Sequence, residues 1–515
     1  MVGPGGYLEV DGLVPTSRRD EAIVDGLSMR RFSQHLLIPP GRGPMCYVVR
    51  AIAALLLLWV SALLVICWRI HSSNASENHV LFQPESPPAP RQRILVVSPH
   101  CDDETLGAGG YITAAVLAGA DVRILMVTNG DGFGLAAALH YKQIHVTPAL
   151  LRSFAYDRQK EAVDAVRALG VPANHVTFLG FPDRGLADLW SRFWTADHPY
   201  FSRFTFTDHN PYTTSPHPGE PYCGERLLND IEEQMSAFQP DVVLTLHPND
   251  DHPDHRATSS FVRAAIADRQ RMGDAWALRV VCQVFVVHHG DWPIPQGYHP
   301  GVRLAPPFSL VHPDTQWSEL MLTPKEEKSK LSAIQRYRSQ MALMGRFLVS
   351  FVRRTECFGR MQPVMIDLGR DNVPSLVETG AVGDTLLRAV ERDGNIENIE
   401  AAGRAGGLLL RVQLRSRVSQ RVSYTLQLQS ISYGGGEVGR WHVTVRGSNT
   451  DTDIPGAQAS IGERTFQVWI PATLFRGRSD WFVSADTHLS SLQLDRTGWR
   501  EMHILVPARR DSTPA

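Results

Sequence analysis

Histidine and aspartate residues follow a short apolar run in the segment ILVVSPHCDDETLGAGG at residues 94–110. The run Ile94–Ser98 predicts a buried strand, and an open α/β sheet carries its chemistry at the C-terminal ends of its strands. His100 and Asp103 are close enough in sequence for a tight turn to bring both to one cation. Asp102 lies between them and points elsewhere. The segment therefore predicts metal ligands beside a separate base, which is the minimum set for a metal-activated water.

A second segment, DVVLTLHPNDDHPDHRAT at residues 241–258, repeats the order of strand, polar loop and helix. His255 at the start of this helix would complete a His/Asp/His triad. Three protein ligands leave a fourth position for water, as in catalytic zinc sites. His252, one turn before His255, faces the same cavity without needing to bind the metal.

Further motifs accompany these two segments. In chain order the motifs are PHCDDETLGAGG (99–110), VTNGDG (127–132), Arg158-x-x-Glu161, LGFPDRGL (179–186), HPDH (252–255) and YRSQ (337–340). In this order they resemble the PIG-L/LmbE-like family of zinc-dependent N-deacetylases, which remove acetyl groups from N-acetylglucosamine conjugates. The resemblance covers roughly residues 92–360. Cys101 departs from the family pattern, which usually has proline at that position.

The resemblance implies a division of labour among the polar residues. His100, Asp103 and His255 would hold Zn²⁺, which lowers the pKa of a bound water toward about 7. Asp102 would take the proton of this water as general base. A protonated His252 would stabilise the oxyanion of the intermediate.

Three more residues receive roles from the same resemblance. Asp254 would hydrogen-bond His252 and keep it charged, because a nearby carboxylate raises the pKa of a histidine. Arg158 occupies the family position that contacts substrate or acetate. The alternative for Arg158 is a surface ion pair with Glu161, three residues further on. Asp183 is expected to bind substrate or to shape the pocket wall.

Several classes of ligand are excluded. The glycines of Gly107–Gly110 do not have the GxGxxG spacing, and carboxylates stand where a pyrophosphate would need amides, so no nucleotide cofactor is expected. We interpret the glycines as letting the helix start approach the metal loop closely. A net charge of −2 lacks the excess of basic residues that is typical of nucleic-acid-binding proteins. Six cysteines without a CxxC pair predict neither a disulfide framework nor a cysteine zinc site.

Short apolar strands alternate with helical patterns in residues 92–360. Strands are expected at 94–98, 122–128, 175–179, 241–246 and 280–287, and helices at 111–118, 155–169, 225–238, 255–271 and 324–345. This alternation predicts an α/β fold, a Rossmann-like parallel sheet flanked by helices, with the motifs along one edge. The aromatic-rich insertion 187–222 either contacts a sugar ring or packs on itself.

Residues 361–515 alternate apolar and polar residues between glycine-rich turns. This pattern predicts an all-β, sandwich-like accessory domain. Carbohydrate binding is one function that such a domain would serve. The sequence alone indicates no site in it.

The N-terminal region has three predicted parts. Residues 1–45 are interpreted as a disordered tail, 46–69 as a transmembrane anchor and 70–91 as a linker. The uncharged run Ala51–Trp68 approaches the roughly 20 residues that a membrane span needs. A cleaved signal peptide is the alternative, but no good cleavage site follows the run. Arginines gather on its N-terminal side, which predicts a single-pass membrane protein whose catalytic domain is extracytoplasmic.

The sequence thus predicts a metal-dependent hydrolase that removes the N-acetyl group of an N-acetylglucosamine-type conjugate through a zinc-activated water. Its expected partners are an N-acetylated amino-sugar substrate and the membrane. Two alternatives stay open. One is an amidohydrolase for another N-acyl glycolipid or polysaccharide. The other is a non-catalytic carbohydrate-binding envelope protein, which the intact Asp102 and His252 disfavour.

Overall fold

The structure is a computed structural model of the 515-residue chain. It describes residues 52–54, 56–57, 59–61, 82–380, 392–431, 438–478 and 480–507. Contacts divide the chain into two units, Met1–Ile70 and His71–Ala515. The predicted tail and most of the predicted anchor and linker lie outside the described residues. Among the residues that are described, no helix is both long enough and apolar enough to cross a membrane.

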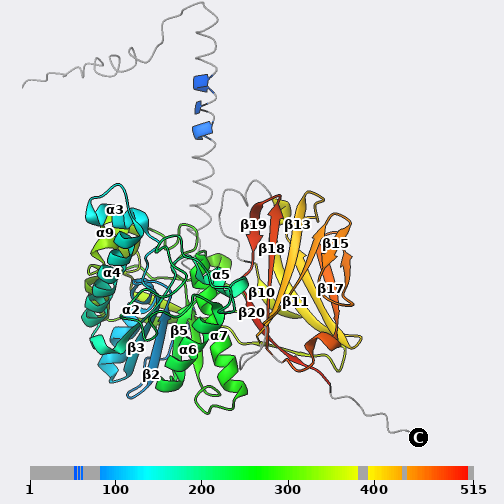
Figure 1. Cartoon of the computed structure of the whole chain (residues 1–515), viewed down its shortest axis with the longest axis horizontal. Coiled ribbons are helices and arrows are strands. Elements are labelled where there is room, and N and C mark those ends of the chain that lie inside the picture. Colours follow the sequence, from blue (N-terminus) through cyan, green and yellow to red (C-terminus); the bar gives the residue numbers. More distant parts are fainter. Residues whose placement is uncertain are drawn as a thin grey trace, which may run out of the picture. The chain divides into compact units, whose positions relative to one another are not determined.

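The α/β part of the second unit is built on one sheet. Its strands are β1 Gln83–Pro84, β2 Arg93–Ser98, β3 Asp121–Thr128, β4 Val176–Phe181, β5 Val242–Leu246, β6 Val281–Phe285, β7 Gln316–Met321 and β8 Thr355–Arg360. They form an eight-stranded sheet in the order β1-β7-β8-β6-β5-β2-β3-β4 (Figure 1). Strand β8 runs antiparallel to its neighbours β7 and β6, whereas the other pairings are parallel. The α/β class is confirmed, but the prediction of a purely parallel sheet is wrong.

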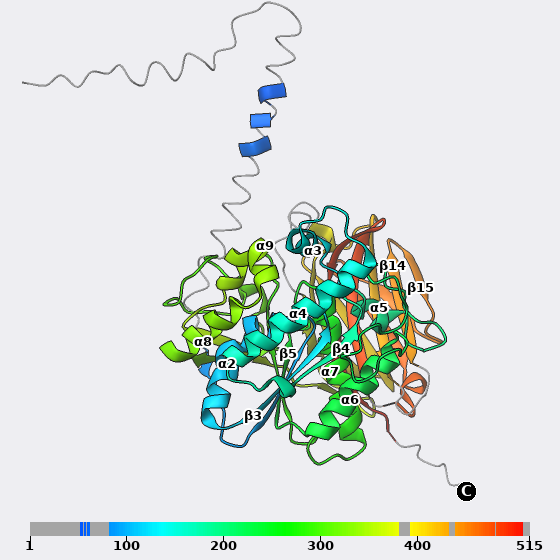
Figure 2. The same cartoon turned by 60° about the vertical axis from the view of Figure 1, so that its left-hand side comes forward.

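Helices cover both faces of this sheet (Figure 2). They are α2 Asp103–Ala118, α3 Gly134–Tyr141, α4 Pro148–Ala168, α5 Leu186–Ser191, α6 Gly224–Phe238, α7 Pro253–Arg271, α8 Pro324–Ile334 and α9 Arg338–Val349. Strand β2 shows why its sequence is continuously apolar. Ile94 and Val96 pack in the core with α2, α4 and α8, while Leu95 and Val97 pack in the core with α6 and α7. A strand buried on both faces has no polar alternation.

Helix α2 begins at Asp103, so the glycine run lies inside the helix rather than in a turn before it. A Cβ atom on Gly107 would come within 1.9 Å of the Phe285 ring. A Cβ atom on Gly110 would come within 2.4 Å of Leu322. The glycines therefore let α2 pack closely on neighbouring elements. This corrects the interpretation that they serve the approach to the metal loop.

The buried carboxylate of Glu356 connects helices α2 and α8 to strand β8 of the sheet. The Lys330 Nζ of α8 lies 2.6 Å from the Glu356 Oε1 of β8, and both side chains are fully buried. Glu356 also accepts hydrogen bonds of 2.7 Å from the backbone N–H groups of Gly110 and Tyr111. One carboxylate thus joins β8 and α8 to the helix whose first residues form the candidate site.

Residues 364–505 contain the remaining strands. They are β9 Val364–Asp367, β10 Ser375–Thr379, β11 Ile396–Arg404, β12 Gly407–Leu414, β13 Val422–Ser430, β14 Gly439–Arg446, β15 Asn449–Thr452, β16 Gln458–Ile461, β17 Thr465–Pro471, β18 Asp480–Leu489, β19 Leu492–Arg496 and β20 Arg500–Leu505. One sheet has five strands (β10-β11-β12-β17-β16), and the other has seven (β15-β14-β13-β18-β20-β9, with β19 on β18). Leu410 and Val412 of the first sheet share a core with Leu426 and Leu428 of the second. The predicted β-rich character of this region is confirmed.

The Lys330–Glu356 pair generates a stability prediction. Lys330→Met leaves the Glu356 carboxylate buried without its cation, so the free energy of unfolding should fall by about 3–5 kcal/mol. The measurement is urea unfolding followed by circular dichroism. The matched control is Arg167→Met, which breaks an exposed helix-surface pair with Asp164 and should cost less than about 0.5 kcal/mol. Equal effects of the two substitutions would contradict the role given to the buried pair.

Candidate active site

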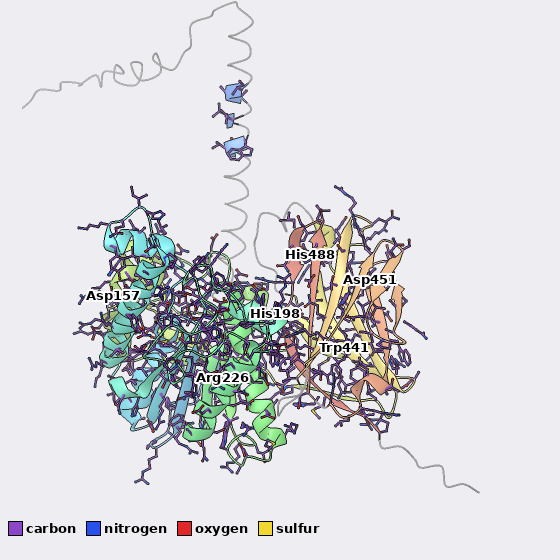
Figure 3. All side chains as sticks on the ribbon, in the orientation of Figure 1. Asp157, His198, Arg226, Trp441, Asp451 and His488 are labelled. Carbon is purple, nitrogen blue, oxygen red and sulfur yellow. The ribbon has the colours of Figure 1, made fainter. Side chains whose placement is uncertain are left out.

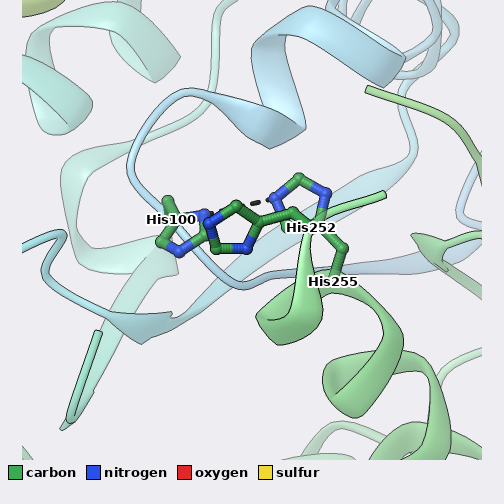
Figure 4. Close-up of side chains that lie close together, drawn as sticks. All are labelled: His100, His252 and His255. Carbon is green, nitrogen blue, oxygen red and sulfur yellow. Dashed lines mark hydrogen bonds between the residues drawn. The ribbon is translucent and has the colours of Figure 1, made fainter. Parts of the chain in front are cut away.

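Three donor atoms converge beyond the C-terminal ends of the adjacent parallel strands β2 and β5. The Nδ1 of His100 lies 3.1 Å from the Oδ2 of Asp103, and the Nε2 of His255 lies 3.1 Å from the same oxygen. The two ring nitrogens are 3.2 Å apart. All three side chains are buried. Figure 4 shows the rings of His100 and His255 with this contact, and His252 beside them.

This arrangement fits a divalent cation. Ligands of a tetrahedral zinc ion at bond lengths near 2.0–2.1 Å lie roughly 3.3 Å apart. The three observed separations are 3.1–3.2 Å. Two facing imidazole nitrogens at that distance cannot both carry a proton, so at least one presents a lone pair. Two imidazole nitrogens and a carboxylate oxygen also form a donor set that zinc accepts.

Asp250 orients His255 from behind. Its Oδ1 lies 3.1 Å from the Nδ1 of His255. Its Oδ2 accepts the backbone N–H groups of Val287 and His288 at 2.9 Å each. Burial would raise the pKa of Asp250, but the positive charge of His255 holds that pKa below its ordinary range. A carboxylate at Nδ1 keeps the proton there and leaves Nε2 free for a metal. Sequence reasoning missed Asp250, although it stands two residues before the HPDH motif.

Asp102 is the N-cap of α2 and adopts φ 152° and ψ −27°, a backbone conformation that favours glycine. Strained residues of this kind cluster at active sites. Burial raises the pKa of Asp102 to about 7, while the positive charge of Arg158 opposes this shift. The Oδ2 of Asp102 lies 3.5 Å from the Nη2 of Arg158. A carboxylate with a pKa near neutrality has the proton affinity that a general base needs.

Arg158 is buried and links two loops of the site. Its guanidinium donates to the backbone carbonyls of Gly130 at 3.1 Å and Cys101 at 2.9 Å. Glu161 instead accepts hydrogen bonds from the backbone N–H and the hydroxyl of Ser339, at 2.9 and 2.6 Å. The alternative of a surface Arg158–Glu161 ion pair is therefore wrong. The YRSQ motif, to which Ser339 belongs, holds α9 against α4.

Asp254 lies in the site but not where it was predicted. Its carboxylate lies 3.3 Å from the Nε2 of His100 and accepts the backbone N–H groups of Arg184 and Leu186. It therefore faces His100, and the predicted hydrogen bond from the Asp254 carboxylate to His252 is wrong. At the start of α7 the Asp254 side chain points toward α5 and binds the free amides there.

His252 is the N-cap of α7, and its Nδ1 accepts the backbone N–H of Asp254 at 3.3 Å. Burial lowers the pKa of His252 to about 2, and an Nδ1 that accepts a backbone N–H carries no proton. The ring is therefore neutral, with its proton on Nε2. This corrects the prediction of a protonated His252. A neutral ring still has one N–H to donate.

Asp183 lies in the wall of the site, as expected. Its Oδ2 accepts the backbone N–H of Gly132 at 2.8 Å, and its Oδ1 lies 3.4 Å from the Nε2 of His100. Burial would lower the pKa of His100, but Asp183, Asp103 and Asp254 together raise it well above its usual value. Carboxylates therefore hold the Nε2 side of His100, just as Asp250 holds the Nδ1 side of His255.

A cavity of about 170 Å³ opens over these groups. Its lining residues are His100, Asp102, Asp103, Phe133, Arg158, Asp183, Arg184, His252, His288, Gln340 and Met344. Sequence reasoning did not single out His288, whose ring stacks on that of Phe347 at a centroid distance of 5.4 Å. One nitrogen of His288 lies within 4.8 Å of donor atoms of Asp103 and His255. The signal available in the sequence was the pair His288-His289 after the strand expected at 280–287.

Comparison with known proteins gives an independent view of the same segment. Residues 95–266 match the family model described as PIG-L: GlcNAc-PI de-N-acetylase. Two curated relatives, from Mycobacterium sp. strains KMS and JLS, are 34% and 33% identical over 206 residues. Both are described as 1D-myo-inositol 2-acetamido-2-deoxy-alpha-D-glucopyranoside deacetylase. The match covers 36% of this chain and 58% of each relative, so the chain spans less than two thirds of their length.

A solved structure of a conserved protein from Thermus thermophilus aligns with 53% of this chain and 95% of that one. The sequence identity is 23% and the TM-score is 0.33. The family assignment rests on the sequence match, which includes both the HCDDE and the HPDH segments. The segment 95–266 that matches the PIG-L model contains the three residues whose donor atoms converge.

Proposed function

We propose that this chain is a metal-dependent N-deacetylase that hydrolyses the acetamido group of an N-acetylglucosamine-type conjugate. The observation that carries the proposal is the set of three donor atoms 3.1–3.2 Å apart beside Asp102. The family match and the descriptions of the two mycobacterial relatives support this class of substrate.

Zn²⁺ would be held by the Nδ1 of His100, the Oδ2 of Asp103 and the Nε2 of His255. When bound, zinc supplies Lewis acidity, which favours loss of a proton from water and polarises a carbonyl oxygen. The protein supplies the orientation of the two rings. Asp250 fixes His255, and Asp183 with Asp254 fixes His100.

Asp102 performs the proton transfers. Water adds through its oxygen to the carbonyl carbon of the acetamide, and the proton of the water passes to the Asp102 carboxylate. The same proton is then delivered to the amide nitrogen as the C–N bond breaks. The products are acetate and the free amino sugar. A pKa of about 7 suits both directions of transfer at neutral pH.

His252 and Arg158 act on the reacting oxygen and on the base. The Nε2–H of the neutral His252 ring donates to the oxygen that becomes negative when water adds. Arg158 lies 3.5 Å from Asp102 and favours the ionised carboxylate. Both side chains line the cavity, so they meet the substrate without rearrangement of the fold.

The first test is acetate release by the full chain from a panel of N-acetylglucosamine conjugates. Chelation should abolish release, and added Zn²⁺ should restore it, because the three donor atoms act only through a bound cation. Release that survives complete removal of metal would overturn the metal dependence. Stoichiometric metal without release from any conjugate would overturn the proposed substrate class.

Two substitutions separate the base from a metal ligand. Asp102→Asn should keep stoichiometric zinc and lower kcat by about 10²–10⁴-fold, since it removes a proton acceptor. His255→Ala should lose both zinc and activity. Zinc content is measured by atomic emission, and activity by acetate release. Asp102→Asn with a kcat within threefold of the unsubstituted chain would refute the assignment of the base.

The pKa of Asp102 also predicts a pH profile. Below pH 7 the carboxyl is protonated and accepts no proton, so kcat/KM should fall about tenfold per pH unit. Arg158→Gln removes the opposing positive charge, so this acid limb should move to higher pH by about one unit. The control is Arg152→Gln on the same helix, where Arg152 contacts the Thr205 carbonyl. Profiles that coincide for all three proteins would exclude Asp102 as the titrating group.

A further inference from the structure

A second cavity lies between helices α5 and α7 and the outer face of the seven-stranded sheet. Its volume is about 380 Å³, compared with about 170 Å³ over the candidate active site. Ligand pockets commonly measure about 300–1,000 Å³. We call this cavity the sheet groove. Its polar lining residues are Ser191, Arg192, Arg256, Gln427, Ser484, Asp486, Gln493, Arg496 and Thr497. The sheet groove shares no lining residue with the active-site cavity.

The groove continues into a smaller hollow of about 130 Å³. Ser191, Gln427 and Trp499 line both. The smaller hollow adds Trp441 of β14, which Figure 3 labels on the β-rich part. The combined surface therefore runs across β18, β13 and β14. A groove of about 380 Å³ that continues into a hollow of about 130 Å³ suits a ligand with several ring units rather than one small molecule.

Buried polar atoms along this surface lack partners. The Nε1 of Trp190, the Oε1 of Gln429 and the Nε of Arg440 have no hydrogen-bond partner within the described ranges. Trp190 and Gln429 are each only 1% exposed. An unsatisfied buried polar group in a native protein calls for an explanation, such as a bound ligand. Two of these atoms are donors and one is an acceptor.

The lining chemistry matches a sugar chain. Gln493 offers an amide donor and an amide acceptor, which pair with hydroxyl groups. Gln427 offers its amide oxygen, since its Nε2 already donates to the Oδ2 of Asp486. The partly buried indole of Trp499 offers a flat apolar surface for the C–H face of a pyranose ring. An aromatic surface with a few placed polar groups is the usual composition of a small-ligand site.

The charges favour a neutral ligand over an anionic one. Arg256 donates to the backbone carbonyls of Asp250 and Asp251 at 3.1 and 2.8 Å. Arg496 donates to the Asp251 carbonyl at 2.9 Å. Both guanidinium groups are thus engaged by the protein. The third arginine of the lining, Arg192, lies 3.7 Å from the Asp188 carboxylate, and the Asp486 carboxylate lies 3.0 Å from the Nδ1 of His488. The charged groups of the lining therefore have partners within the protein. We propose that the sheet groove binds a neutral oligosaccharide. This inference does not rest on the proposed hydrolytic function, because the two cavities are separate.

The test is isothermal titration calorimetry of the full chain with a panel of neutral tetrasaccharides built from N-acetylglucosamine, glucose, mannose or galactose. The Asp102→Asn background prevents hydrolysis during the titration. At least one tetrasaccharide should bind at submillimolar concentration, and Trp499→Ala should weaken that binding at least tenfold. Trp469→Ala, which removes a half-buried indole from the five-stranded sheet, is the matched control and should leave it unchanged.

Gln493→Ala is a second test variant, in case Trp499→Ala fails to fold. Gln493 is exposed, so its truncation should leave the fold intact. It should weaken binding about threefold. In the otherwise unsubstituted chain, Trp499→Ala and Gln493→Ala should leave acetate release from a monosaccharide conjugate unchanged, which separates groove binding from active-site binding. The proposal is overturned if no tetrasaccharide binds at millimolar concentration. It is equally overturned if Trp499→Ala and Gln493→Ala bind as tightly as the control.

Discussion

The candidate active site is a cluster of buried carboxylates whose negative charge favours a cation beside them. Its carboxylates are Asp102, Asp103, Asp183, Asp250 and Asp254, all buried. Burying a charge is costly unless an opposite charge accompanies it. The carboxylates around His100 and His255 raise the pKa of both imidazoles. A proton and a metal ion compete for the same lone pairs on these rings, so the field that attracts one also attracts the other.

The fold supplies the convergence on which this charge cluster depends. His100 and His255 are far apart in sequence, but they follow the adjacent parallel strands β2 and β5. Parallel neighbours end at the same edge of a sheet, so the turns that follow them meet there. Helix α2, held by the buried Glu356 carboxylate and by close packing at its glycines, fixes where Asp103 stands. Core packing thus sets the distances between the ligands.

The converging residues could be predicted from the sequence because each follows a run of apolar residues that ends at a polar segment, which marks the C-terminal end of a strand. Sequence reasoning did not find their partners. Asp250 and Asp254 both stand near His252 and His255, and spacing alone does not tell which carboxylate faces which ring. The direction of the Asp254 side chain depends on the free backbone amides of α5, which come from a distant segment. The antiparallel strand β8 was missed for a similar reason. Its pairing with β7 and β6 depends on contacts between segments far apart in the sequence.

The first turn of α7 lies between the active-site cavity and the sheet groove. His252 and His255 stand one turn apart and belong to the active site, whereas Pro253 and Arg256 stand one turn apart and line the sheet groove. Arg256 donates to the backbone carbonyl of Asp250, and the carboxylate of Asp250 holds His255. A group that displaced Arg256 would therefore act on the loop that orients His255. A chain of direct contacts thus runs from the lining of the groove to a ring of the candidate active site.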